Sequence, residues 1–109
     1  MRPIRVTVVN VAVSAPIPCD QYLTPFNLGI GVKMVGGATY KVQHTFDNVF
    51  DPAFTPAAAT WYDHTSLAGL SADADGNYAF PVSAVRLSVT AADSAAEGAT
   101  LTVLQAGVR

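Results

Sequence analysis

Charged residues are scarce in this sequence, and basic clusters and long apolar runs are missing. Asp, Glu, Lys and Arg make up 13% of the 109 residues, about half the roughly 25% that is usual in soluble proteins. The net charge is −2 and no run of basic residues occurs, which excludes nucleic acid as an expected partner. No apolar run approaches the roughly 18 residues of a membrane-spanning helix, so we expect no membrane partner either.

Cysteine is also nearly absent, since Cys19 is the only one. A lone cysteine excludes an internal disulfide and a cysteine metal cluster. Asp20 follows it directly, and a neighbouring carboxylate disfavours the thiolate, so we expect a small loop residue rather than a nucleophile. The N-terminal segment contains Arg and an apolar stretch, but Thr7 and Asn10 interrupt the stretch. We therefore expect a strand rather than a secretion signal, in a protein made in the cytoplasm.

Alternation of apolar and polar residues dominates what is present. This period of two is typical of half-buried β-strands, and it occurs in residues 4–13, 27–35, 38–47, 83–90 and 99–105. A shorter strand is expected at 77–81, ending at Pro81. The inward-facing residues predicted from the alternation are Leu28, Ile30, Val32, Met34, Tyr40, Val42, His44, Phe46, Val85, Leu87, Val89, Leu101 and Val103.

Two of these strands have a further feature besides alternation. Residues 4–13 become apolar on both faces through Val9, Val11 and Val13, which predicts a strand that is either central or covered by a partner chain. On 27–35, Gly29 and Gly31 share one face and leave a groove that something large, or another backbone, can approach.

Turn signals predict how these strands connect. Gly36-Gly37 is typical of a tight hairpin, Asp75-Gly76-Asn77 of a turn before the next strand, and residues 92–98 of a hairpin loop between the last two strands. Six to eight short strands favour an all-β fold, an antiparallel β-sandwich. Long connections at 14–26 and 47–76 favour a Greek-key or jelly-roll arrangement. We expect a single domain over 1–109, with residues 1–4 as an N-terminal arm.

The acidic residues and histidines do not have the spacing of a catalytic or metal-binding site. Segment 73–77 lacks the third oxygen ligand and the Glu of a calcium loop, and two histidines twenty residues apart make no zinc signature. We expect turn and loop-end roles for the Asp residues and a buried, hydrogen-bonded His44. The sequence therefore predicts no enzyme, no cofactor and no metal. The Asp and His residues considered are Asp47, Asp51, Asp63, Asp73, Asp75, His44 and His64.

The long connection is rich in aromatic residues and proline. Phe50, Phe54, Trp61 and Tyr62 lie in it, together with two prolines, Pro52 and Pro56. Aromatic residues carry much of the binding free energy at protein interfaces, and proline limits the entropy lost on ordering a loop. Two interpretations stay open: the loop binds a neighbouring chain, or it caps its own sandwich. The candidate partner interface comprises Phe50, Phe54, Trp61, Tyr62, Val9, Val11 and Val13.

Three stretches together resemble small virion structural proteins of tailed bacteriophages. They are PIPCDQYLTPFNLGIGVKM, YKVQHTFDNVFDPAFTPAAATWYDH and AFPVSAVRLSVTA, and with the N-terminal strand they cover most of the chain. Proteins of this size and strand content are similar to capsid decoration, or cement, proteins. That resemblance implies a jelly-roll-like homodimer or homotrimer on the capsid exterior that bridges major capsid subunits. It implies no catalytic residues.

Two alternative functions remain open from the sequence. One is another virion role, as a tail, neck or fibre-associated component. The other is a carbohydrate-binding β-sandwich that uses Trp61, Tyr62 and nearby Asp side chains.

Overall fold

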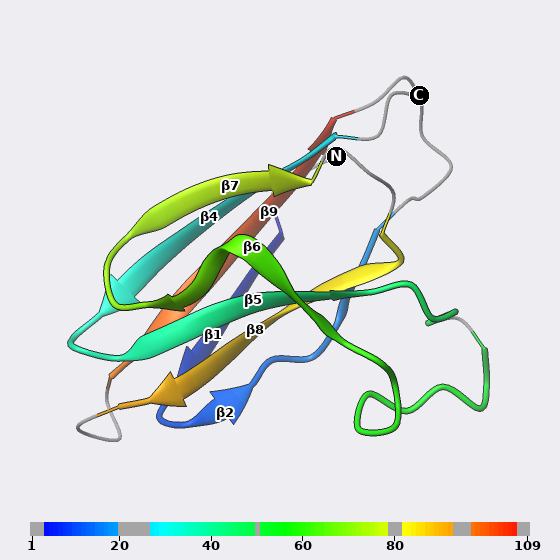
Figure 1. Cartoon of the computed structure of the whole chain (residues 1–109), viewed down its shortest axis with the longest axis horizontal. Helices are drawn as coiled ribbons and strands as arrows, with labels where there is room; N and C mark the ends of the chain where they lie inside the picture. Colours follow the sequence, from blue (N-terminus) through cyan, green and yellow to red (C-terminus); the bar gives the residue numbers. More distant parts are fainter. Residues whose placement is uncertain (1–3, 20–26, 50, 79–81, 93–96, 107–109) are drawn as a thin grey trace.

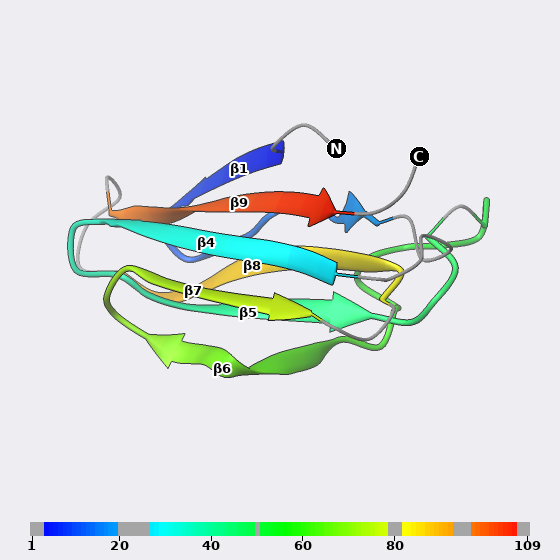
Figure 2. The same ribbon diagram turned by 90° about the horizontal axis from the view of Figure 1, so that it is seen from above.

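Two antiparallel β-sheets face each other in the computed structural model of the chain (Figure 1). The structure describes residues 4–19, 27–49, 51–78, 82–92 and 97–106, and every structural statement below concerns these residues. They form β-strands and turns and contain no helix. Figure 2 shows the two layers from above. The prediction of an all-β antiparallel sandwich is confirmed.

The strands divide between a four-stranded sheet and a five-stranded sheet. The four-stranded sheet has the order β1-β9-β4-β7, with β1 at Ile4–Val9, β9 at Gly98–Ala106, β4 at Asn27–Val35 and β7 at Ala74–Tyr78. The five-stranded sheet has the order β2-β8-β5-β6, with β2 at Ala12–Val13, β8 at Ala84–Ala91, β5 at Thr39–Thr45 and β6 at Tyr62–Leu70; β3 at Ile17–Pro18 also pairs with β8.

This strand order is that of a jelly roll. The chain changes sheet between most consecutive strands, and only β2–β3 and β5–β6 are consecutive strands within one sheet. Since β2 and β3 both pair with β8, they act as two parts of one edge strand. Each sheet therefore interleaves strands from distant parts of the chain, as the double Greek key requires.

The two predicted hairpins are wrong. β4 and β5 flank Gly36-Gly37 but belong to different sheets, and so do β8 and β9. Gly36 does adopt a left-handed conformation, with φ of 78°, so the turn signal itself is correct. A turn signal reports a sharp change of direction, and it does not distinguish strands that pair side by side from strands that face each other across a core.

The core lies between the sheets and consists of the side chains that alternation assigned to the inside. Leu28, Tyr40, Leu87 and Leu101 are completely buried. Phe46 is the clear exception, with 54% of its surface exposed, because β5 ends one residue before it. The predicted inward residues found buried are Leu28, Ile30, Val32, Tyr40, Val42, His44, Val85, Leu87, Val89, Leu101 and Val103.

The predicted loop at 47–76 is wrong, because two strands lie in its second half. β6 and β7 occupy most of 62–78, and Asp75-Gly76-Asn77 lies inside β7 rather than in a turn. The buried or half-buried positions of β6 are His64, Leu67 and Leu70, three residues apart. Register shifts in the pairing of β5 with β6 insert extra residues into β6 and destroy the period of two.

The N-terminal strand is also shorter than predicted. It breaks at Asn10, which has a φ of 61°, and the chain passes there from the four-stranded to the five-stranded sheet. Residues 1–3 of the predicted arm lie outside the described residues, and Ile4 already belongs to β1.

We predict that Gly69→Ala destabilises the fold by about 1–2 kcal/mol, the cost of placing a Cβ in the left-handed region. Gly69 has a φ of 70°, and an added Cβ would meet no atom within 4 Å. The backbone conformation therefore supplies the whole effect, which urea unfolding would measure.

Gly31→Ala is the matched control for this substitution. An added Cβ at Gly31 also meets nothing within 4 Å, and its φ lies outside the left-handed region. We expect a change within about 0.5 kcal/mol. Equal effects of the two substitutions would contradict the assignment of a strained bulge to Gly69.

Candidate interaction surface

Residues 46–61, here called the aromatic loop, leave the end of β5 and project beyond the end of the two sheets (Figure 1). The base of the loop is closed by two hydrogen bonds. The Thr60 N–H donates to Asp47 Oδ2 at 2.9 Å, and Thr45 Oγ1 donates to the Thr60 carbonyl at 2.8 Å. The loop therefore leaves and re-enters the sheet at a fixed point.

Inside the loop, backbone turns and one carboxylate maintain the shape. The Asp51 N–H donates to the Asn48 carbonyl, and the Phe54 N–H donates to the Asp51 carbonyl. Asp51 Oδ1 accepts the Ala53 N–H at 2.9 Å. The predicted turn and loop-end roles of Asp47 and Asp51 are confirmed.

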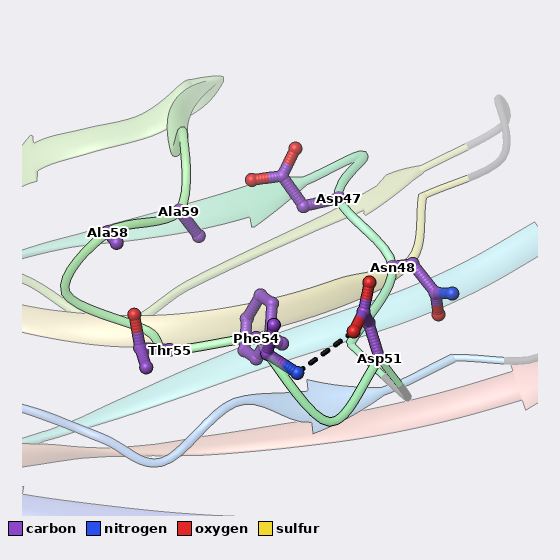
Figure 3. Close-up of a pocket in the computed structure, with 8 residues that line it drawn as sticks. Asp47, Asn48, Asp51, Phe54, Thr55, Ala58 and Ala59 are labelled. Carbon is purple, nitrogen blue, oxygen red and sulfur yellow. Dashed lines mark hydrogen bonds between the residues drawn. The ribbon is translucent and has the colours of Figure 1, made fainter.

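A cavity of about 220 Å³ lies within this loop (Figure 3). The Asp47 carboxylate points toward the returning arm of the loop and away from Asp51 (Figure 3). Phe54 is half-buried and lines the cavity together with other residues of the loop. The described residues contain no cluster of three or more His, Cys, Asp or Glu that could hold a metal ion. The cavity is lined by Asp47, Asn48, Asp51, Ala53, Phe54, Thr55, Ala58 and Ala59.

Trp61 connects the aromatic loop to the outer face of the five-stranded sheet. Its ring is half-buried and lies over the Arg86 guanidinium, 4.1 Å from the guanidinium carbon to the ring centroid. Its Nε1–H donates to the Pro56 carbonyl at 2.9 Å. Trp61 therefore packs on its own sandwich and pins the loop there. Phe50, the first of the four predicted interface aromatics, lies outside the described residues.

Beside Trp61, a row of polar side chains crosses the outer face of three strands. Arg86 on β8 donates from Nε to Gln43 Oε1 at 2.8 Å, and Gln43 on β5 donates from Nε2 to Asp63 Oδ1 at 3.0 Å. Lys41 forms an ion pair with Asp63 at 3.5 Å. Partial burial lowers the pKa of Arg86, because desolvation disfavours a charged group. The sequence did not predict this row.

Tyr62 is the first residue of β6, and its side chain points to the opposite side of the strand from that of Trp61, the residue before it, because successive residues of an extended chain alternate. Its ring stacks on His44, with centroids 5.9 Å apart, and lies 5.7 Å from Phe46. Tyr62 and Phe46 are 50% and 54% exposed. Trp61 and Tyr62 therefore cannot form one continuous binding platform, whereas Phe46 and Tyr62 lie side by side.

Both histidines are buried and hydrogen-bonded. His44 Nδ1 and the Tyr78 hydroxyl are 2.8 Å apart, as the sequence predicted for a structural histidine. His64 lies within β6. Its Nδ1 accepts the Ser66 N–H at 3.0 Å, so Nε2 carries the proton and donates to the Asn77 carbonyl at 2.9 Å. This bond joins β6 to β7 across the two sheets.

Val9, Val11 and Val13, the predicted apolar segment, form an exposed ridge at the β1/β2 side of the sandwich. Their exposed fractions are 53%, 59% and 50%. The prediction of a central strand is wrong, because β1 and β2 are edge strands. The open alternative was that a partner chain covers them. Val9 follows the buried Val8 of β1, and Val13 pairs with the outward-facing Ser88 of β8. The two side chains therefore belong to the outer faces of different sheets, and the valine ridge (Val9, Val11 and Val13) follows the edge between them.

Cys19 directly follows β3 and is buried, and desolvation raises the pKa of its thiol to about 12. A thiol with this pKa is not ionised at neutral pH, which agrees with the predicted structural role.

Comparisons with protein-family models, curated proteins and solved structures found no match to this chain. In the described part of the chain, no helix is long and apolar enough to cross a membrane.

We predict that His44 makes the fold lose stability as the pH falls below about 6.5, the value for an unfolded histidine. The pKa of His44 is lowered in the folded state by burial and by His64. The unfolded chain then binds a proton that the folded chain does not, so stability is complete above the unfolded pKa and decreases toward the folded one.

Comparison of wild type with His44→Gln would isolate this contribution. The amide keeps a polar partner for Tyr78 but does not titrate. Urea unfolding between pH 7.5 and pH 5 would show a shallower loss of stability in the variant. Parallel curves for the two proteins would contradict the prediction.

Proposed function

We propose that this protein is a non-enzymatic structural protein of a tailed-bacteriophage virion. In this role it decorates the capsid exterior and bridges major capsid subunits as a homodimer or homotrimer. The observation that carries the proposal is the valine ridge, an apolar surface on the two edge strands. The resemblance of the three sequence stretches to small phage virion proteins supplies the biological setting.

The edges of the sandwich are physically suited to assembly. Edge strands present unpaired backbone N–H and C=O groups, and proteins usually protect them with charge or proline. Here the edge strands β1 and β2 carry Val9 and Val13, and Val11 lies in the connection between them. An added strand or a flat protein surface would satisfy the backbone groups and remove apolar area from water.

Fractionation of purified particles of the phage that encodes the chain tests this proposal. A capsid decoration protein should be present in hundreds of copies per particle. A small multiple would instead favour the tail, neck or fibre-associated role. Absence from the particle would refute both virion roles.

A double substitution, Val11→Thr with Val13→Thr, tests the valine ridge directly. We expect roughly tenfold weaker attachment to particles assembled without the protein, since apolar area that binding would bury is replaced by hydroxyls. Because both side chains are exposed, the free energy of unfolding should change by only about 0.5 kcal/mol per site. A pull-down of protein on sedimented particles would measure attachment.

Leu104→Thr is the control for the ridge substitutions. Leu104 is 49% exposed on β9, six residues along the strand from Gly98, the partner of Val9. Its substitution should leave attachment unchanged. Attachment that survives the double substitution would remove the valine ridge from the interface.

A second candidate function, glycan binding, is favoured by the exposed pair of Phe46 and Tyr62. Aromatic rings offer an apolar face, and tyrosine adds a hydroxyl at its tip. Centroids 5.7 Å apart with planes inclined by 55° form an angled platform. This platform replaces the pairing of Trp61 with Tyr62 that the sequence suggested.

A glycan array with wild type, Tyr62→Ala and Phe46→Ala would test this second function. Binding that both substitutions weaken would support it. Leu104→Ala is the control, because Leu104 is 49% exposed on the other sheet. A wild-type protein that binds no glycan, or binding that Tyr62→Ala leaves unchanged, would eliminate this candidate.

A further inference from the structure

We infer that the outer face of the five-stranded sheet is a docking face on which Arg86 receives a carboxylate from the protein partner. This inference deepens the proposed function, and it rests on that function only for the partner's identity, an acidic side chain of a shell subunit. The chemistry of the site follows from the arrangement of Arg86, Trp61, Gln43 and Asp63.

Arg86 is held in one orientation by two contacts. The ring of Trp61 covers its guanidinium at 4.1 Å, and Gln43 Oε1 accepts its Nε–H at 2.8 Å. A guanidinium stacked on an indole loses little further entropy when it binds a ligand. These contacts leave the two terminal nitrogens, the pair that binds a carboxylate in a bidentate manner.

Those terminal nitrogens are available. No carboxylate of the described residues forms an ion pair with Arg86, and its one hydrogen bond is through Nε. Every buried side-chain nitrogen or oxygen in the same part of the chain has a hydrogen-bond partner. The terminal nitrogens have none, so they are accessible to solvent.

The local charge is incompletely compensated. The nearest link from Arg86 to a carboxylate runs through the neutral amide of Gln43 to Asp63, and Asp63 already pairs with Lys41. A half-buried guanidinium without a direct counter-ion has lost part of its hydration, so a carboxylate that arrives with a partner gains a charge-assisted pair.

The surroundings of Arg86 match the anatomy of a protein interface. Val13 lies opposite Ser88, two residues along β8 from Arg86 on the same outer face. The valine ridge therefore reaches this face through Val13, near the Trp61–Arg86 pair, and Lys41 and Asp63 form the polar rim. Trp and Arg are the residue types most enriched among binding hot spots.

A protein carboxylate fits this face better than a nucleic-acid phosphate backbone does. Binding to a nucleic acid requires several cations in a row, and this face combines Arg86 with a Lys41 that Asp63 neutralises. A single oriented guanidinium beside an indole is suited to one carboxylate on an apolar surface.

Trp61 provides the test, because it is the only tryptophan of the chain and contacts Arg86. Titration with a blocked hexaglutamate peptide at low salt should change Trp61 fluorescence in a saturable manner. Blocked hexaglutamine should give no response. Arg86→Gln should weaken hexaglutamate binding roughly tenfold, because one charge-assisted bidentate pair is lost. The affinity of Arg86→Lys for hexaglutamate should lie between those of wild type and Arg86→Gln.

Arg5→Gln is the matched control, since it removes the same charge from an exposed site on β1 of the other sheet. Its affinity should equal that of wild type. Calorimetric titration gives a second affinity that does not depend on indole fluorescence, and circular dichroism confirms that each variant folds.

Three results would overturn the inference. They are hexaglutamate binding unchanged in Arg86→Gln, an equal loss in Arg5→Gln, or tighter binding of oligothymidylate than of hexaglutamate. The copy number of the protein in particles is measured separately. A protein present in particles whose peptide binding ignores Arg86 would refute the inference and leave the proposed function standing. If peptide binding requires Arg86 but the protein is absent from particles, the proposed function would be refuted and the inference about Arg86 would stand.

Discussion

Burial of alternate side chains of β4, β5, β8 and β9 between the two sheets is the interaction on which the rest of the structure depends. Completely buried residues such as Leu28, Leu87 and Leu101 each contribute about 1.5–3 kcal/mol relative to exposure. With so few charged residues, a chain of this length depends on that core. Because the inner faces of the two sheets form this core, the surfaces available for binding are the outer faces, the edges and the aromatic loop.

The regular strands could be predicted from the sequence because their burial follows a strict period of two. β6 could not, because its bulges at Gly69 and at 64–67 shift the buried positions to every third residue. The hairpins at Gly36-Gly37 and 92–98 were wrong for another reason. Local turn chemistry is the same whether the chain stays in a sheet or crosses the core, and only long-range packing decides between the two.

The candidate interaction surface could also be predicted only in part. The sequence directed attention to the aromatic residues and to the valines, and the structure places Trp61 and the valine ridge on accessible surfaces. It did not identify Arg86, because Gln43 and Arg86 are 43 residues apart and meet only through the pairing of β5 with β8. The one sequence signal was an arginine at an outward position of an otherwise neutral strand, and alternation alone does not say what lies beside it.

The order of side chains in the polar row has a consequence for charge. Direct contact between Asp63 and Arg86 would have cancelled the charge of the guanidinium and left it with little affinity for another carboxylate. The amide of Gln43 stands between them: Asp63 accepts from its nitrogen, so its oxygen must face Arg86. Asp63 therefore fixes the orientation of the Gln43 amide, and through it that of Arg86, without cancelling the charge of the guanidinium. Trp61 adds the second constraint. The hydrogen bond from Thr60 to Asp47 closes the aromatic loop directly before Trp61, and the indole, which lies over Arg86, donates its own hydrogen bond to the Pro56 carbonyl. The aromatic loop thus serves to position a cation on the sheet beside it.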